Sequence, residues 1–149
     1  MDDEFWMRHA LNEARIAYDE GEVPVGAIVV CNGKIVGRGH NMTERLGDVT
    51  AHAEIMAITA AEQTLGGKYL PDCTLYVTVE PCAMCAGAIG WSQLRKIVYG
   101  ASDPKRGYHS HFNPNDDCPS PLHPKAEVTA GVLRDEASEL MSSFFKSRR

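Results

Sequence analysis

The sequence predicts an α/β fold in which helices pack on a mixed β-sheet. Segments with strand and helix patterns alternate along most of the chain, which is typical of strands joined by helical crossovers. Before this alternation begins, two strand-like segments flank Asn32-Gly33, a dipeptide that favours a two-residue hairpin turn. The length of 149 residues fits one compact domain spanning 1–149.

The first elements follow from apolar spacing. A helix is expected near the N-terminus, ending before Gly21, because apolar residues recur there at helical intervals: Trp6, Met7, Ala10, Leu11, Ala14, Ala17 and Tyr18. The run from Ala27 to Cys31 predicts a buried strand, and Lys34 to Arg38 predicts its hairpin partner.

The remaining elements alternate between strand and helix. After a polar loop at residues 41–48, a helix is expected over about 50–65, then a strand over 74–78 leading into Pro81-Cys82, where proline suits a first helical turn. A further strand covers 96–100. A last helix over about 133–146 presents a stripe expected to face the core: Ala137, Leu140, Met141, Phe144 and Phe145.

The segment from Asp103 to Pro124 breaks this alternation. It has five prolines and little periodicity, and a loop of this length in a small domain is usually functional or disordered.

Composition indicates an ordinary globular protein, with 44% hydrophobic and 23% charged residues. A formal net charge of -5 disfavours a general nucleic-acid binder. Lysines and arginines nevertheless concentrate in the last third of the chain. They form either a local basic patch or simply a solvated surface. No apolar run approaches the roughly 20 residues that span a bilayer. The acidic N-terminus lacks the features of a signal peptide, so a cytoplasmic location is expected.

Two short motifs carry the chemistry: His52-Ala53-Glu54 and Pro81-Cys82-Ala83-Met84-Cys85. Together they supply three zinc ligands and one spare carboxylate. Structural zinc sites use four protein ligands, whereas catalytic sites leave a position open for water. The combination matches the H-x-E…P-C-x-x-C pattern of zinc nucleobase deaminases. The expected cofactor is therefore one Zn²⁺ per chain, bound by His52, Cys82 and Cys85.

The spacing sets a geometric condition on this hypothesis. In mid-helix, His52 and Glu54 would point about 200° apart, so both serve one site only if the metal lies off the end of the helix. Zinc lowers the pKa of bound water from ~15.7 towards ~7, and Glu54 is then the expected proton shuttle of a hydrolytic deamination. A redox pair or a structural zinc site also fits an isolated C-x-x-C, but no second C-x-x-C completes a zinc ribbon.

At these motifs the chain resembles the cytidine deaminase-like superfamily and, within it, the bacterial tRNA-specific adenosine deaminases. The resemblance extends to residues 22–27, 51–57, 75–89, 103–107 and 144–149. It implies a three-layer α/β/α fold with a central five-stranded mixed sheet, a homodimer, and conversion of adenosine to inosine at the wobble position of a tRNA anticodon. An anticodon loop is single-stranded and can present a splayed-out base.

The resemblance also implies roles for individual residues. Asn41 would hydrogen-bond the flipped-out nucleotide, and Val25, Ala27 and Ala53 would lie along the base pocket. Asp103 and Lys105 would contact the RNA beside that base, and Arg148 and Arg149 would approach the tRNA backbone. Four of these residues have a simpler alternative: Asn41 as a loop or cap residue, Val25 and Ala27 as core, and Asp103 as a turn residue.

The chain departs from the family pattern where substrate would be bound. The departures are Tyr108-His109-Ser110-His111-Phe112, Leu122-His123-Pro124 and Trp91. A tryptophan at this last position resembles the related guanine deaminases. The departures leave open a deaminase of a free base or nucleoside, of guanine or cytosine type, with the same zinc centre. A non-enzymatic zinc-stabilised RNA-binding subunit is a third possibility, but it would not need Glu54. Within the loop, aromatic stacking on RNA bases is favoured over a second metal at His109 and His111.

Overall fold

The computed structural model describes residues 1–148, so Arg149 lies outside the described part of the chain. Its centre is a five-stranded sheet in the order β2-β1-β3-β4-β5. The strands are β1 (Gly26–Cys31), β2 (Lys34–His40), β3 (Cys73–Val79), β4 (Lys96–Ala101) and β5 (Glu127–Thr129). β1 is antiparallel to β2 and β3, whereas β3, β4 and β5 run parallel. The predicted mixed sheet is confirmed.

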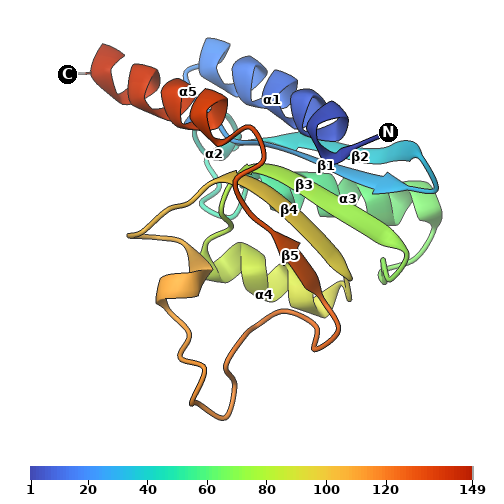
Figure 1. The fold of residues 1–149 in the computed structure, drawn as a ribbon. Coiled ribbons are helices and arrows are strands. Elements are labelled where there is room, and N and C mark those ends of the chain that lie inside the picture. The colour runs from blue at the N-terminus through green and yellow to red at the C-terminus, as the bar shows by residue number, and fades with distance from the viewer. Residues whose placement is uncertain (149) are drawn as a thin grey trace.

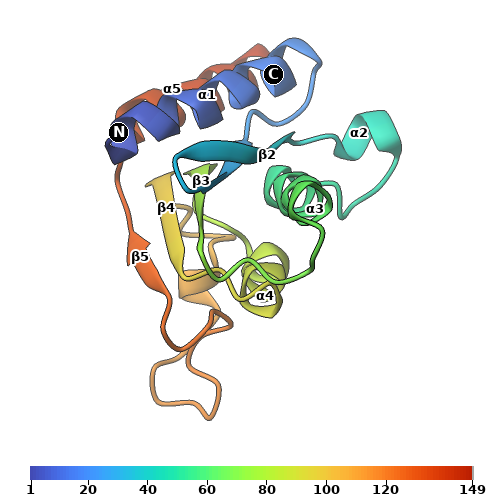
Figure 2. The same ribbon diagram turned by 90° about the vertical axis from the view of Figure 1, so that its right-hand side faces the viewer.

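Helices cover both faces of this sheet (Figures 1 and 2). On one face lie α1 (Asp3–Asp19) and α5 (Arg134–Ser147), and on the other lie α3 (Ala53–Leu65) and α4 (Ala83–Trp91). This arrangement confirms the three-layer α/β/α fold. Between residues 1 and 148, no helix is both long and apolar enough to cross a bilayer.

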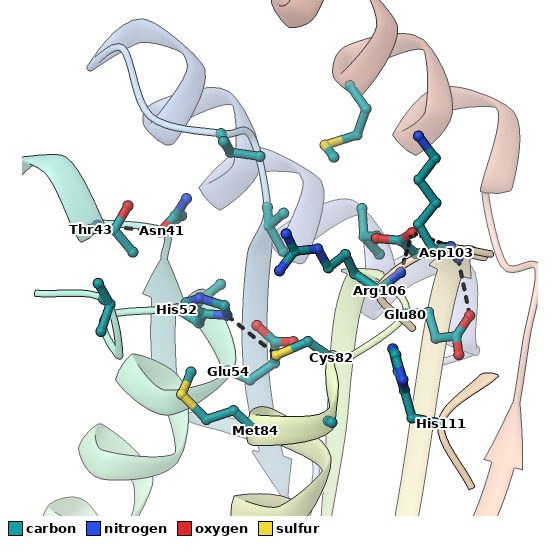
Figure 3. A pocket seen from close by; sticks show the side chains of 18 of the residues that line it. Asn41, Thr43, His52, Glu54, Glu80, Cys82, Met84, Asp103, Arg106 and His111 are labelled. Atoms are coloured by element: carbon teal, nitrogen blue, oxygen red, sulfur yellow. Dashed lines mark hydrogen bonds between the residues drawn. The ribbon is translucent and has the colours of Figure 1, made fainter. Parts of the chain in front are cut away.

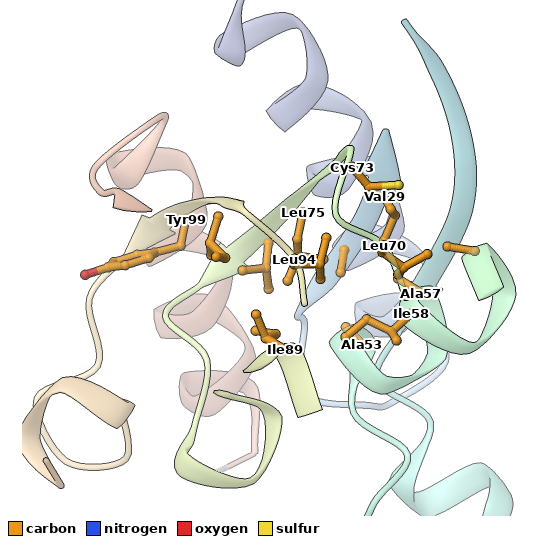
Figure 4. Packing of buried hydrophobic residues seen from close by; sticks show 14 residues of the cluster. Val29, Ala53, Ala57, Ile58, Leu70, Cys73, Leu75, Ile89, Leu94 and Tyr99 are labelled. Carbon is orange, nitrogen blue, oxygen red and sulfur yellow. The ribbon is translucent and has the colours of Figure 1, made fainter. Parts of the chain in front are cut away.

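Each face of the sheet has its own apolar cluster. Figure 4 shows the cluster under α3 and α4, where Leu75 of β3 packs with Ile58 and Ile89. On the opposite face, Tyr76 of the same strand joins the cluster that contains Met7 and Leu11 of α1. Because adjacent strand residues point to opposite faces, β3 is buried on both sides. The apolar runs of the sequence therefore correspond to central strands.

Helix α3 packs unusually close to β2. A Cβ atom on Gly39 would lie 2.4 Å from the carbonyl oxygen of Ala53, and one on Gly37 would lie 2.3 Å from that of Ala57. Only glycine permits this approach of backbone to backbone. The contact places the first turn of α3, which carries Glu54, against the sheet.

Five details differ from the sequence-based expectations. The helix expected from about residue 50 begins at Ala53, and Pro81 lies outside α4, which begins at Ala83. The polar loop contains a short helix, α2 (Thr43–Leu46), and the long loop contains the 3-10 helix η1 (Tyr108–Ser110). Phe145 is 49% exposed rather than in the core, because it extends past the face of α5 that contacts the sheet.

Candidate active site

Three potential metal ligands converge at the N-termini of two helices. His52 is the N-cap residue of α3, Cys82 is the N-cap residue of α4, and Cys85 lies in the first turn of α4. The backbones of His52 and Cys82 are extended. The directions of these two side chains therefore do not follow the 3.6-residue period of a helix. The geometric condition is thus met: the three ligands gather off the helix ends, and Figure 3 shows His52 beside Cys82.

The distances between the donor atoms fit a tetrahedral zinc ion. His52 Nδ1 lies 3.7 Å from Cys82 Sγ and 3.5 Å from Cys85 Sγ, and all three donors lie within 4.8 Å of one another. Tetrahedral bonds of about 2.3 Å to sulfur and 2.0 Å to nitrogen separate those atoms by about 3.6 Å. Three donors leave one position of the tetrahedron for another ligand.

The electrostatic environment favours a thiolate at Cys82. Hydrogen bonding with Cys85, supported by His52, lowers the pKa of the Cys82 thiol to about 4. The thiolate is the form that binds zinc. The helix N-terminus at which Cys82 lies also stabilises negative charge.

Glu54 is the spare carboxylate. It is in the first turn of α3 and 4% exposed, and Figure 3 shows its side chain beside the sulfur of Cys82. Burial raises the pKa of Glu54 to about 7. A carboxyl group with a pKa near neutrality can both accept and return a proton.

A cavity of about 960 Å³ is lined by His52, Glu54 and Cys82 of this cluster. It extends from these residues to apolar and basic side chains of the segment before β1, of α4 and α5, and of the loop after β4. Five of the residues expected at the substrate line it: Val25, Asn41, Ala53, Asp103 and Lys105.

Two expected substrate residues of the described chain, Ala27 and Arg148, do not line the cavity. Ala27 is completely buried in the core under α3, because β1 is a central strand covered on both faces. That part of the base-pocket expectation is corrected, and core packing is its role. Arg148 is exposed and its guanidinium lies 4.4 Å from the centre of the Phe144 ring. Arg149 lies outside the described residues.

Two of the lining residues also make local backbone bonds. Asn41 Oδ1 accepts a hydrogen bond from the Thr43 N–H at 3.3 Å. Asp103 Oδ1 accepts bonds from the N–H groups of Lys105 and Arg106 at 3.1 and 3.0 Å. The turn role of Asp103 is therefore present in the structure, and its carboxylate shapes the loop that carries Lys105.

Most of the unusual residues lie away from the cavity. Trp91 is 85% exposed at the end of α4 and is not part of the cavity wall, and of the long-loop residues 108–112 only His111 lines the cavity. Among residues 1–148, His52, Cys82 and Cys85 form the only group of three potential metal ligands. A second metal at His109 and His111 is not supported in this part of the chain.

Sequence reasoning missed several residues of the cavity wall. Glu80, Arg106 and Phe145 all line it. The available signal for Glu80 is its position directly before Pro81-Cys82, close in sequence to a metal ligand. The helical spacing of Phe145 matches the core-facing stripe, so the sequence predicts a core position for a residue that lines the cavity instead.

Comparisons with known proteins place this site in a family. Residues 1–101 match the model of the "Cytidine and deoxycytidylate deaminase zinc-binding region". A tRNA-specific adenosine deaminase of Bacillus subtilis is 44% identical over 147 residues, which cover 99% of this chain and 91% of that protein.

Two solved structures share the fold. One, from a study of A-to-I editing by tRNA:A34 deaminases at the wobble position of transfer RNA, has a TM-score of 0.82 and 43% identity, covering 90% of this chain and 96% of the other. The guanine deaminase of Nitrosomonas europaea has a TM-score of 0.80 and 27% identity, covering 96% of this chain and 84% of the other.

Fold, donor set and family model agree on the class of protein, a zinc-dependent deaminase. The chain belongs to the cytidine and deoxycytidylate deaminase family and, within it, to the tRNA-specific adenosine deaminases.

Proposed function

We propose that this protein hydrolyses adenosine to inosine at the wobble position of a tRNA anticodon. The observation that carries this proposal is the cluster of three donors beside the buried Glu54, inside a cavity whose wall includes Lys105 and Arg106. Cationic side chains beside a cavity large enough to admit a nucleobase suit the phosphates of an RNA strand. Relatives across nearly the whole chain are tRNA-specific adenosine deaminases.

In the proposed mechanism, His52, Cys82 and Cys85 hold one zinc ion. Zinc bound in such a site lowers the pKa of water towards ~7 and so makes a nucleophile available at neutral pH. Glu54 accepts the proton of the attacking water and delivers it to a ring nitrogen of the base. The water oxygen bonds to the ring carbon that carries the amino group. Glu54 then passes the remaining hydroxyl proton to that amino group, which leaves as ammonia while the carbon becomes a carbonyl. Its burial keeps bulk water from competing for this proton.

The walls of the cavity hold the base. We assign Asn41 to hydrogen bonding with the flipped-out nucleotide, because the amide lines the cavity while only its oxygen is used by Thr43. Val25 and Ala53 supply apolar contact with the base. Lys105 faces the neighbouring phosphates, on a loop shaped by the Asp103 carboxylate.

Four further properties complete the proposal. The chain acts as a single deaminase domain and works as a homodimer. Arg148 and Arg149 contact the tRNA backbone, and the exposed side chain of Arg148 supports that role. The protein acts in the cytoplasm, consistent with the free thiols among its described cysteines, which are typical of a reducing compartment.

A set of RNAs that differ at one position tests the proposal. Anticodon stem-loops with adenosine, guanosine or cytidine at the wobble position are incubated with zinc-loaded protein, and released ammonia is measured. Ammonia from the adenosine RNA alone supports the proposal. Ammonia from the cytidine RNA, or no ammonia from any of the three RNAs, contradicts it.

One observation favours a second candidate, a guanine deaminase. The enzyme from Nitrosomonas europaea shares the fold at a TM-score of 0.80. Trp91, however, does not line the cavity. Its resemblance to the guanine deaminases therefore does not indicate which base the cavity binds. The adenosine assignment remains the stronger one.

A further inference from the structure

The cavity wall contains a buried carboxylate that the proposed mechanism does not use. Glu80 follows β3 directly and is 6% exposed. Among the ion pairs of residues 1–148, none involves Glu80. Burying a carboxylate that accepts no hydrogen bonds costs folding free energy. The groups that donate hydrogen bonds to Glu80 therefore indicate its role.

Both carboxylate oxygens of Glu80 accept hydrogen bonds from one loop. Oε1 accepts from the N–H of Asp103 at 3.0 Å, and Oε2 accepts from the N–H of His109 at 3.1 Å. These donors are the two ends of the segment 103–109, and Figure 3 shows Glu80 beneath Asp103. One side chain therefore holds both ends of the segment 103–109.

The segment between those ends carries Lys105 and Arg106, which line the cavity. It is also joined to the metal-ligand segment, because Tyr108 N–H donates to the carbonyl oxygen of Pro81 at 2.8 Å. Glu80 lies two residues before Cys82 and thus holds the loop at a set distance from the metal ligands.

Gly107 supports this interpretation independently. A Cβ atom at this position would lie 2.3 Å from Glu80 Cδ and 2.5 Å from the carbonyl oxygen of Asp103. The loop can reach the carboxylate only because residue 107 has no side chain. A substitution here is expected to push the loop away from Glu80 while leaving the carboxylate intact.

We propose that Glu80 is a positioning residue: its two backbone hydrogen bonds hold the 103–109 loop where Lys105 and Arg106 meet the RNA. This assignment rests on the proposed function for its substrate, but the loop contact itself does not. Glu80 acts on substrate binding through the loop, whereas moving protons is the role assigned to Glu54.

Two variants test the proposal, Glu80→Gln and Gly107→Ala, with Glu139→Gln as a control on the exposed surface of α5. Zinc content, amide hydrogen exchange and steady-state kinetics with the adenosine stem-loop are measured for each. We expect one zinc per chain in all variants. Exchange at the Asp103 and His109 amides should rise about tenfold or more, since each loses a charge-assisted bond. KM should rise by a similar factor with kcat nearly unchanged, and the control should match the parent.

Unchanged exchange at both amides would overturn the proposal, as would a fall in kcat at constant KM. Should Glu80→Gln fail to fold, Gly107→Ala decides, because it retains the carboxylate. Should the parent protein form no inosine, the proposed function fails and the exchange measurement still decides whether Glu80 holds the loop.

Discussion

Glu54 and the three metal ligands come from two short motifs, and within each motif the functional residues are two or three positions apart. Their chemistry is local in sequence, so spacing alone was enough to identify them. Glu80 and Asp103 meet across 23 residues, and no local pattern reports such a contact. The same limit explains Ala27, whose burial depends on strands and helices on both sides of β1.

Glu54→Ala should retain zinc and lose turnover. Zinc contact comes from the other three side chains, whereas removing a general acid–base group typically costs on the order of 10²- to 10⁴-fold in rate. Metal analysis and single-turnover inosine formation check this. Near-normal turnover would show that Glu54 is not the proton shuttle.

Cys73 should make stability depend on alkaline pH. Burial raises the pKa of its thiol from 9.0 to about 12 in the folded protein, whereas the unfolded chain ionises near the ordinary value. Between these values the folded state holds more protons, so stability falls as pH rises. Urea unfolding midpoints at pH 8 to 11 check this, and Cys73→Ala should flatten the slope. An identical slope in that variant would contradict the assignment.

At the scale of elements, long periodic segments were predicted well and short ones were not. α1, α3 and α5 and the strands β1 to β4 follow from apolar spacing. α2 and β5 have only four and three residues, too few to show a period. β5 exists because Glu127 to Thr129 pair with β4, a tertiary contact that overrides weak local preference.

Gly39→Ala should displace the first turn of α3. The added Cβ would meet the carbonyl oxygen of Ala53, and overpacking of this kind costs about 1–3 kcal/mol. We expect a lower unfolding midpoint and weaker zinc binding, because His52 precedes this turn. Gly67→Ala is the matched control, since nothing lies within 4 Å of its Cβ position. Equal zinc affinity in both variants would show that the close contact does not position the site.

At the scale of the whole molecule, the metal joins parts of the chain that are 30 residues apart, from His52 to Cys82. The three layers were expected from the resemblance, and the topology confirms them. The alternation of the sequence could not set the strand order, because which strands become neighbours depends on how the helices pack on each face.

Removing zinc should lower the stability of the whole fold. A ligand that binds only the folded state contributes about 2.7 kcal/mol at a hundred times its Kd, equivalent to roughly 5–10 °C in Tm for a domain of this size. Calorimetry with and without a chelator measures the shift, and zinc should restore it. A Tm that does not respond to either treatment would contradict a zinc site formed by these three ligands.

The most direct test of the central claim is a competition between substrates. Zinc-loaded protein is given the adenosine stem-loop and free guanine together, and inosine, xanthine and ammonia are measured over time. The account predicts inosine in the RNA, one ammonia for each inosine, and unchanged guanine. Release of ammonia from guanine with the RNA intact would contradict it.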